Sequence, residues 1–161
     1  MKRFFDLADF ELAEILDLLA LAQALKDKPE RRALSNKILG LLFFNPSLRT
    51  LASFQAAMAR LGGTSFVIMP GQGTWQLETR MHAIMDGAAA EHVREAIPVL
   101  ASYCDALGVR AFADGRNLKS DLDETLFRLI DDLCEVPMIN LESAMNHPCQ
   151  ALADWRTLDE L

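Results

Sequence analysis

The sequence predicts an α/β fold of three layers, in which helices flank a parallel sheet of about four strands. Helical and strand-like patterns alternate along the 161 residues, and such alternation is typical of βαβ units with right-handed crossovers. The strand-like stretches are continuous apolar runs, as expected when both faces of a sheet are covered. The length is sufficient for one domain with its own hydrophobic core.

The first expected elements are a helix, a strand and a second helix. Asp9 is the expected cap of the first helix, which ends near Lys28-Pro29. The apolar positions of this helix recur at helical spacing and are Leu12, Ile15, Leu16, Leu19 and Ala22. The run ILGLLFF at 38–44 predicts the first strand. A second helix is indicated by the spacing of Leu51, Phe54, Met58 and Leu61, and Gly62-Gly63 stops it.

The remaining elements continue the alternation. A second strand is expected at 64–70, and a loop of about twenty residues separates it from a helix at 91–103 that Pro98 kinks. The later elements are a strand at 105–110, a helix at 121–133, a strand at 136–140 and a last helix that begins near Pro148. The sheet is therefore expected to be Rossmann-like, with ligands bound beyond the carboxyl ends of its strands.

Composition excludes several classes of protein. The formal net charge of -7 argues against a general nucleic-acid binder and against binding to anionic membranes, but local arginines can still hold a small anion. No apolar run reaches the roughly 18 residues of a membrane span, and we expect no signal peptide. The cysteines, Cys104, Cys134 and Cys149, are far apart, which favours a reduced, cytoplasmic setting over a disulfide scaffold or a zinc site.

Polar side chains gather just past three of the expected strands. They are Ser47, Arg49 and Thr50 after the first strand, Arg110 at the end of the third, and Glu142, His147 and Gln150 after the fourth. The SLRT segment is also the first turn of a helix, where free N–H groups and the helix dipole favour an anion. Arg49 adds a forked donor suited to phosphate. No GxxxxGK[ST] or GxGxxG motif is present, which argues against ATP and dinucleotides.

Each of these residues also has an ordinary structural interpretation. Ser47 can be a helix cap, Arg49 a surface residue and His147 a loop histidine. Further alternatives are that Arg110 pairs with Asp105 or Asp114, that Glu142 caps the last helix, and that Trp75 anchors its long loop in the core. The joint placement past three strand ends favours an anion site over separate structural roles.

Three motifs carry a resemblance to a known family. FFNPSLRT, LGVRAF and HPCQ, in this order and spacing, resemble the carbamoyl-phosphate-binding domain of the aspartate/ornithine carbamoyltransferases. The family's Ser-x-Arg-Thr motif, arginine and His-Pro-x-Gln motif fall on residues 47–50, 110 and 147–150. The resemblance covers nearly the whole chain and implies a single domain at 1–161, with the family's second, amino-acid-binding domain absent from this chain.

A second set of residues resembles one branch of that family. GQGTWQLETRMHAIMDGAAAEH and INLES are similar to the N-acylornithine carbamoyltransferases, which act on N-acetyl- or N-succinyl-ornithine in arginine biosynthesis. By this resemblance Trp75 reaches the active site of a neighbouring subunit in a homotrimer, and Glu142 lies beside the acylornithine. Ala90 stands where the acetyl type has an acid and the succinyl type a proline. A small uncharged residue repels a succinyl carboxylate less than an acid does, which favours the succinyl type.

The resemblance also implies a mechanism. The neutral δ-amine attacks the carbonyl of carbamoyl phosphate directly and phosphate leaves, without a metal or an organic cofactor. The phosphate would be held by Ser47, the backbone N–H groups of Leu48 and Arg49, the Arg49 side chain and Thr50. The carbonyl oxygen would be polarised by Arg110, His147 and Thr50, and Gln150 would orient the carbamoyl NH₂.

The sequence departs from the family at Leu51, because relatives usually have a second arginine directly after Ser-x-Arg-Thr. Leu51 can belong to a repacked core, or it can leave a buried acid without its partner. A missing second domain would leave half an active site, so a non-catalytic phosphate-binding or trimer-scaffold protein stays open as a second class. Ornithine carbamoyltransferase is a further alternative. A response-regulator-like phosphate binder would need an acid where Asn45 stands.

Overall fold

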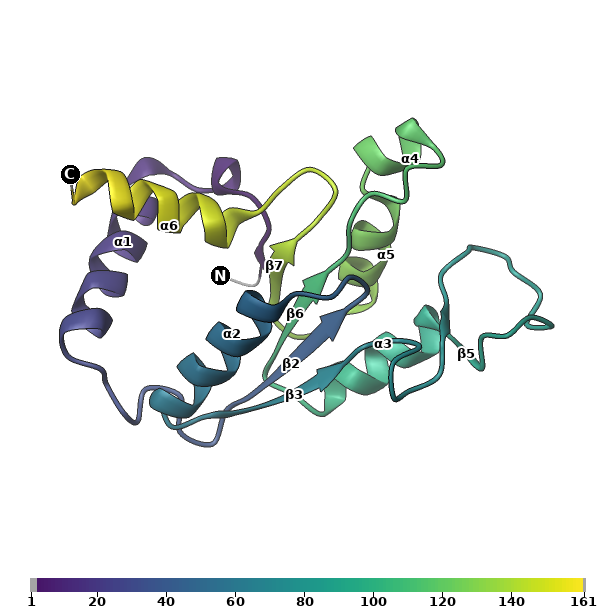
Figure 1. Cartoon of the computed structure of the whole chain (residues 1–161), viewed down its shortest axis with the longest axis horizontal. Coiled ribbons are helices and arrows are strands. Elements are labelled where there is room, and N and C mark those ends of the chain that lie inside the picture. Colours follow the sequence, from purple (N-terminus) through teal and green to yellow (C-terminus); the bar gives the residue numbers. More distant parts are fainter. Residues whose placement is uncertain (1–2, 161) are drawn as a thin grey trace.

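A five-stranded parallel sheet runs through the middle of the computed structural model, which describes residues 3–160 (Figure 1). The strands lie in the order β1-β7-β6-β2-β3. Their bounds are β1 Arg3–Phe4, β2 Ile38–Phe43, β3 Thr64–Ile68, β6 Ala106–Arg110 and β7 Met138–Glu142. The expected α/β class is confirmed, and the two-residue β1 is an addition to the expected strands. Residues 1–2 and 161, the ends of the expected domain, lie outside the described part.

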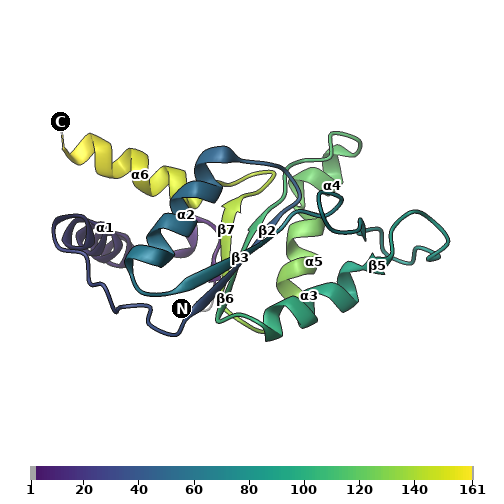
Figure 2. The ribbon, with the colours of Figure 1, turned by 60° about the horizontal axis from the view of Figure 1, so that its bottom comes forward.

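Helices cover both faces of the sheet (Figure 2). One side carries α1 (Leu12–Asp27), α2 (Leu48–Arg60) and α6 (Pro148–Asp159), and the other carries α3 (Val93–Ser102), α4 (Leu118–Leu122) and α5 (Thr125–Leu133). Successive strand residues serve opposite faces, because side chains alternate along a strand. Leu42 packs with Ile97 and Phe127 of the α3 and α5 layer, whereas Leu41 packs with Met58 of α2. No helix within residues 3–160 has the length and apolar character needed to cross a membrane.

Two expected helix starts were wrong. Glu11, not Asp9, caps α1, and it forms a reciprocal capping box with Glu14. Asp9 instead ends a short 3-10 helix at Leu7–Asp9. The helix expected from residue 91 begins at Val93, because residues 91–92 form β5 (Glu91–His92), which pairs with β4 (Leu77–Glu78) inside the long loop.

Two further corrections affect the functional end of the sheet. The helix expected at 121–133 is broken, because α4 ends at Leu122 and Glu124 adopts a left-handed conformation with φ of 50° before α5 begins. The strand expected at 136–140 lies two residues later, as β7. Glu142 is therefore the last residue of a strand and not part of the following loop. The expected end of the second helix at Gly62-Gly63 is confirmed, because α2 ends at Arg60 and Gly62 adopts a left-handed φ of 85°.

Candidate functional site

The carboxyl ends of three neighbouring strands meet in one row. Phe43 of β2 is the register partner of Arg110 of β6, which in turn is the partner of Glu142 of β7. The register shifts here, because Val109 pairs with Asn140 while Arg110 pairs with Glu142. The extra residue in β7 makes a bulge, and bulges often re-aim side chains beside functional sites. Here the bulge brings a carboxylate opposite the arginine.

Glu142 joins two of the three residues that were expected to act on the carbonyl, Arg110 and His147. Its Oε2 lies 2.5 Å from Arg110 Nη1 and 3.3 Å from His147 Nε2. Arg110 is only 8% exposed, and its guanidinium lies over the ring of Phe112 at 4.5 Å. Among the described residues its Nε has no hydrogen-bond partner. The buried Arg110 guanidinium thus pairs with a single carboxylate at the edge of the sheet, and its Nε–H remains a donor without a partner among the described residues.

The pairings considered for Arg110 from the sequence were wrong, because both acids have other partners. Asp105 pairs with Lys37, and Asp114 pairs with Arg116. The lysine holds the pKa of the Asp105 carboxyl below its ordinary value through a side-chain hydrogen bond. The Arg110–Glu142 pair is therefore separate from the surface ion pairs around it.

His147 is the N-cap of α6, and Pro148 occupies the first turn after it. The Nδ1 atom of His147 accepts a hydrogen bond from the backbone N–H of Gln150 at 3.4 Å, so in neutral His147 the Nε2 atom carries the hydrogen that faces Glu142. The interpretation of Glu142 as the cap of this helix was wrong. The Gln150 side chain extends along α6, where its Nε2 donates to Asp154 Oδ1 at 2.8 Å.

The SLRT segment forms the first turn of α2 with Ser47 as its cap. Ser47 Oγ accepts from the backbone N–H of Thr50 at 3.3 Å and donates to Thr50 Oγ1 at 2.9 Å. The cap interpretation of Ser47 is confirmed. The N–H groups of Leu48 and Arg49 lie in the same turn and have no partner within the helix. The Arg49 side chain is exposed, and no ion pair joins it to another described residue.

Two hydrogen bonds join this turn to the strand that carries Arg110. Phe44 donates its backbone N–H to the Arg110 carbonyl at 2.9 Å. Phe112 donates its N–H to Asn45 Oδ1 at 2.8 Å. Asn45 was not predicted as a site residue, and no local pattern signals its role, because its partner Phe112 is 67 residues further along the chain. The SLRT turn and the Arg110–Glu142–His147 cluster therefore adjoin along one sheet edge.

Leu51 packs into the core layer under α2. It is half-buried and contacts the cluster that contains Leu39, Leu41 and Met58. No carboxylate within residues 3–160 is both buried and without a hydrogen-bond partner. These contacts support the repacked-core interpretation of Leu51.

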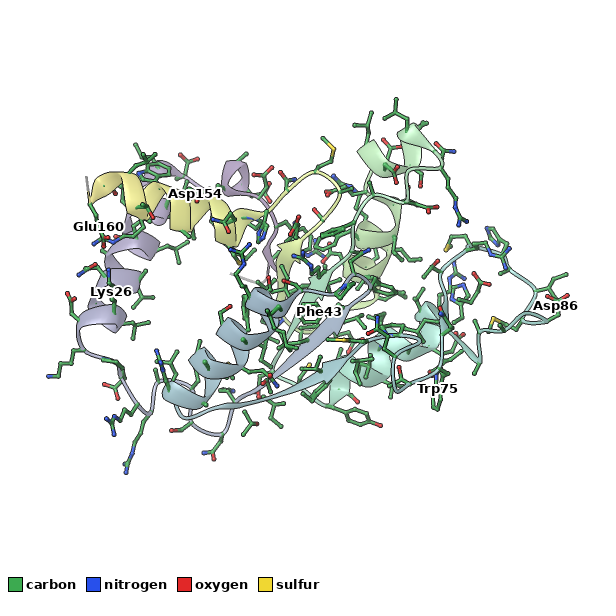
Figure 3. All side chains as sticks on the ribbon, in the orientation of Figure 1. Lys26, Phe43, Trp75, Asp86, Asp154 and Glu160 are labelled. Atoms are coloured by element: carbon green, nitrogen blue, oxygen red, sulfur yellow. The ribbon has the colours of Figure 1, made fainter. Side chains whose placement is uncertain are left out.

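Trp75 and Ala90 lie on the long loop, which extends from the sheet on the side away from α2 and α6 (Figures 1 and 3). Trp75 is 60% exposed, and its Nε1 donates to Glu91 Oε2 at 3.1 Å. The interpretation of Trp75 as a core anchor was wrong. Ala90 lines a cavity of about 410 Å³ together with His82 and Arg94. Trp75 therefore lies exposed on this loop, and the cavity that Ala90 lines does not include Arg110 or His147.

A larger cavity of about 1170 Å³ lies between this loop and the α4–α5 segment, beside Ala111 and Phe112. Its wall includes Glu78, which accepts two hydrogen bonds from the Arg80 guanidinium at 3.0 and 2.8 Å. These bonds lower the pKa of Glu78 to about 2. The wall of this cavity also includes Asn45 and Phe112, the two residues whose hydrogen bond joins the SLRT turn to the strand that carries Arg110. In the described part of the chain no cluster of histidine, cysteine or acidic side chains has the arrangement of a metal site.

Comparisons with known proteins confirm the family that the three motifs resemble. The family model for the aspartate/ornithine carbamoyltransferase carbamoyl-phosphate-binding domain matches residues 2–160. An N-acetylornithine carbamoyltransferase of Xanthomonas campestris pv. campestris is 36% identical over 160 residues, which are 99% of this chain and 47% of the relative. An N-succinylornithine carbamoyltransferase of Bacteroides fragilis is 43% identical over 125 residues, which are 78% of this chain and 39% of the relative.

A solved structure gives the same result in three dimensions. It is an N-acetyl-L-ornithine transcarbamylase in which one glutamate is replaced by alanine, complexed with carbamyl phosphate and N-succinyl-L-norvaline. The TM-score is 0.93 at 36% identity, over 99% of this chain and 48% of the solved one. The chain thus spans less than half the length of these relatives.

Proposed function

This chain belongs to the aspartate/ornithine carbamoyltransferase family as its carbamoyl-phosphate-binding domain, and from this premise we propose that it supplies the carbamoyl-phosphate half of an N-acylornithine carbamoyltransferase site. The observation that carries the proposal is the convergence of Arg110 and His147 on Glu142, next to the first turn of α2. The other half of the site would lie in the amino-acid-binding domain that the family adds.

The first turn of α2 would bind the phosphate. Ser47 and Thr50 supply hydroxyl groups, and Leu48 and Arg49 supply backbone N–H groups at the positive end of the helix dipole. The exposed Arg49 guanidinium would close on the phosphate as a forked donor. The absence of an acid in this turn supports the assignment, because no carboxylate repels the anion there.

Arg110, His147 and Thr50 would polarise the carbonyl oxygen. The δ-nitrogen lone pair forms a bond to the carbonyl carbon, and negative charge then develops on that oxygen. The bond from carbon to the bridging phosphate oxygen breaks, phosphate leaves with the electron pair, and the nitrogen passes a proton to the departing phosphate. Most of the rate gain would come from positioning and charge stabilisation, without a covalent intermediate. We propose that Gln150 exchanges its contact with Asp154 for the carbamoyl NH₂.

Glu142 would contact different groups before and after carbamoyl phosphate binds. It holds Arg110 and His147 when the site is empty, and these groups would transfer their hydrogen bonds to the carbonyl oxygen when carbamoyl phosphate binds. The released carboxylate would then face the acylornithine. This assignment is supported by the position of Glu142 at the end of β7, between the arginine and the histidine.

Ala90 would select the acyl group. We infer that it occupies the place of the glutamate that was replaced by alanine in the N-acetyl-L-ornithine transcarbamylase solved with N-succinyl-L-norvaline. A methyl group at this position neither repels a second carboxylate nor fills its space. The N-succinyl substrate is therefore our first choice and the N-acetyl substrate the second.

We propose that the enzyme is a homotrimer in which Trp75 and Ala90 complete a neighbouring subunit's site. The support is geometric, because the long loop that holds both residues extends from the sheet on the side away from α2 and α6 (Figure 1), and Trp75 is 60% exposed on it. The three cysteines are unpaired thiols, which supports a cytoplasmic location.

Calorimetry with carbamoyl phosphate and with inorganic phosphate tests the proposed site. The Arg49→Ala variant should bind both ligands at least about tenfold more weakly, because it loses a charge-assisted contact. Arg60→Ala is the matched control, since Arg60 is an exposed arginine in the last turn of the same helix. Equal affinities of the parent chain and Arg49→Ala would contradict the assignment.

A steady-state assay tests the reaction. A protein that joins this chain to the family's amino-acid-binding domain should carbamoylate N-succinylornithine faster than N-acetylornithine or ornithine. A preference for plain ornithine would instead identify an ornithine carbamoyltransferase. Phosphate binding without turnover of any of the three amines would favour the non-catalytic alternative, motivated by Leu51 in place of the family's second arginine.

A further inference from the structure

The loop between β7 and α6 connects Glu142, which pairs with Arg110, to His147, which contacts the same carboxylate. Glu142 ends the strand and His147 caps the helix, so residues 143–146 set the distance between them. The loop closes on itself, because Ser143 donates its backbone N–H to the Asn146 carbonyl at 2.8 Å and Asn146 donates its N–H to Ser143 Oγ at 3.3 Å. Any change in the shape of this loop therefore moves His147 relative to Glu142.

Glu124 holds this loop from another part of the chain. Its Oε1 accepts a hydrogen bond from the backbone N–H of Met145 at 3.0 Å and a second one from the Ser143 hydroxyl. Ser143 is buried, and its Oγ also accepts from Asn140 Nδ2 at 2.9 Å. Asn140 is 1% exposed, and the same Nδ2 donates to the Phe5 carbonyl at 3.1 Å. The loop is thus fixed to the body of the domain through one carboxylate and one amide.

The helix that follows Glu124 does not use its side chain as a cap. Glu124 is the N-cap of α5, yet it makes no side-chain capping bond to that helix. It also adopts φ of 50° and ψ of 43°, a left-handed conformation that is strained for a residue with a Cβ. The break between α4 and α5 that this conformation produces directs the carboxylate to the β7–α6 loop. A strained residue that serves a distant loop indicates a role beyond the stability of its own helix.

We propose that Glu124, acting through Ser143, is a positioning residue that sets the distance of His147 from Glu142 and Arg110 and so prepares these groups for the carbonyl of carbamoyl phosphate. The inference rests on the proposed function, because it takes the carbonyl oxygen as the group that Arg110 and His147 meet. It predicts that changes in the β7–α6 loop and changes in the α2 turn affect the two ligands differently. The loop affects recognition of the carbamoyl group, whereas the α2 turn alone binds phosphate.

Calorimetry on this chain, with carbamoyl phosphate and inorganic phosphate as separate ligands, tests the inference. Glu124→Gly removes the carboxylate and suits the left-handed backbone, and it should weaken carbamoyl phosphate roughly tenfold while leaving inorganic phosphate unchanged. Glu124→Gln keeps an oxygen that can accept both hydrogen bonds, and it should bind as the parent does. Asp123→Asn is the control, because Asp123 is a neighbouring carboxylate whose side chain pairs only with Lys119 among the described residues.

A second variant and a second readout keep the test independent of folding. Ser143→Ala removes the hydroxyl between Glu124 and Asn140 and should show the same selective loss. Hydrogen exchange at the Met145 amide should accelerate in Glu124→Gly and stay slow in Glu124→Gln.

The outcomes separate the inference from the proposed function. Parent-like carbamoyl phosphate affinity in Glu124→Gly and Ser143→Ala, or an equal loss of both ligands, would overturn the role of Glu124. Failure of Arg49→Ala to weaken either ligand would overturn the proposed site, and the role of Glu124 with it.

Discussion

Arg110 and Glu142 form an ion pair across two neighbouring strands, with Nη1 and Oε2 2.5 Å apart, and a bulge in β7 makes them register partners. The arginine side chain is 10% exposed and the glutamate side chain 32%. Removal of one partner from such a pair leaves a largely desolvated charge, which costs more than the pair itself contributes. The empty site thus keeps its cation neutralised, and the ligand would have to displace a carboxylate that is already in place.

This pair predicts non-additive stabilities. Glu142→Ala should lower the free energy of unfolding by roughly 2 kcal/mol, because the Arg110 guanidinium loses its partner. Arg110→Met should also destabilise, but the double variant should cost less than the sum of the two single changes. Urea unfolding of the four proteins measures the coupling. Asp114→Asn, which breaks an exposed pair with Arg116, is the control and should change stability by less than about 0.5 kcal/mol. Additive effects would show that the Arg110–Glu142 contact does not contribute in solution.

Leu51 supports a second prediction. Leu51→Arg introduces the arginine that the family resemblance implies after Ser-x-Arg-Thr, and it should lower the free energy of unfolding by about 1–2 kcal/mol because a charge enters the layer formed with Leu39 and Met58. Gln55→Arg adds the same charge at an exposed position of α2 and should be nearly neutral. Thermal and urea unfolding measure both. If Leu51→Arg is instead more stable than the parent, a nearby acidic side chain must pair with the new arginine. That result would contradict the repacked core.

The sequence was sufficient for the layers of the fold but not for the details of the site. Continuous apolar runs located β2, β3 and β6 to within about two residues. The run VPMINLE carries a start signal in Pro137, directly before β7, but no residue in it marks the end of β7 at Glu142 or the bulge after Asn140. Arg110 was correctly placed at a strand end, but its partner depended on that bulge.

The sequence also did not predict the break between α4 and α5. The leucines of residues 121–133 keep one helical face across it, so the apolar pattern indicates a single helix. The left-handed conformation of Glu124 is a tertiary effect, because its carboxylate bonds to the distant Ser143 and Met145. Two-residue strands such as β1 and β5 are too short for any periodic signal.

Glu78 predicts a pH dependence in the acid range. Hydrogen bonds from Arg80 lower the pKa of the Glu78 carboxyl from 4.5 to about 2 in the folded chain. Because the pKa is lower in the folded chain than in the unfolded one, ionised Glu78 stabilises the folded state at pH values above the unfolded pKa of 4.5. This contribution disappears as the pH falls from 4.5 towards about 2. The difference in unfolding free energy between the parent and Glu78→Gln should be constant above about pH 5 and should shrink by about pH 3. Urea unfolding at these pH values measures it.

Arg80→Met serves as the control for this prediction, because it removes the guanidinium but keeps the backbone N–H that also bonds to Glu78 at 2.8 Å. Its acid dependence should be weaker than that of the parent but stronger than that of Glu78→Gln. A gap between parent and Glu78→Gln that persists unchanged to about pH 3 would show that Arg80 does not hold this carboxylate in solution.

Cys149 lies within the HPCQ motif, yet its thiol should be inert. Burial raises its pKa to about 11, and the Sγ atom donates to the Asn140 carbonyl at 3.7 Å. At about pH 8 roughly one molecule in a thousand would carry the thiolate, which is the reactive form. A Cys104→Ser, Cys134→Ser double variant, which keeps only this thiol, should react very slowly with Ellman's reagent in buffer and release one equivalent in urea. Fast reaction of the folded variant would mean that a nucleophile is available beside His147, and it would reopen the covalent route that direct attack by the amine excludes.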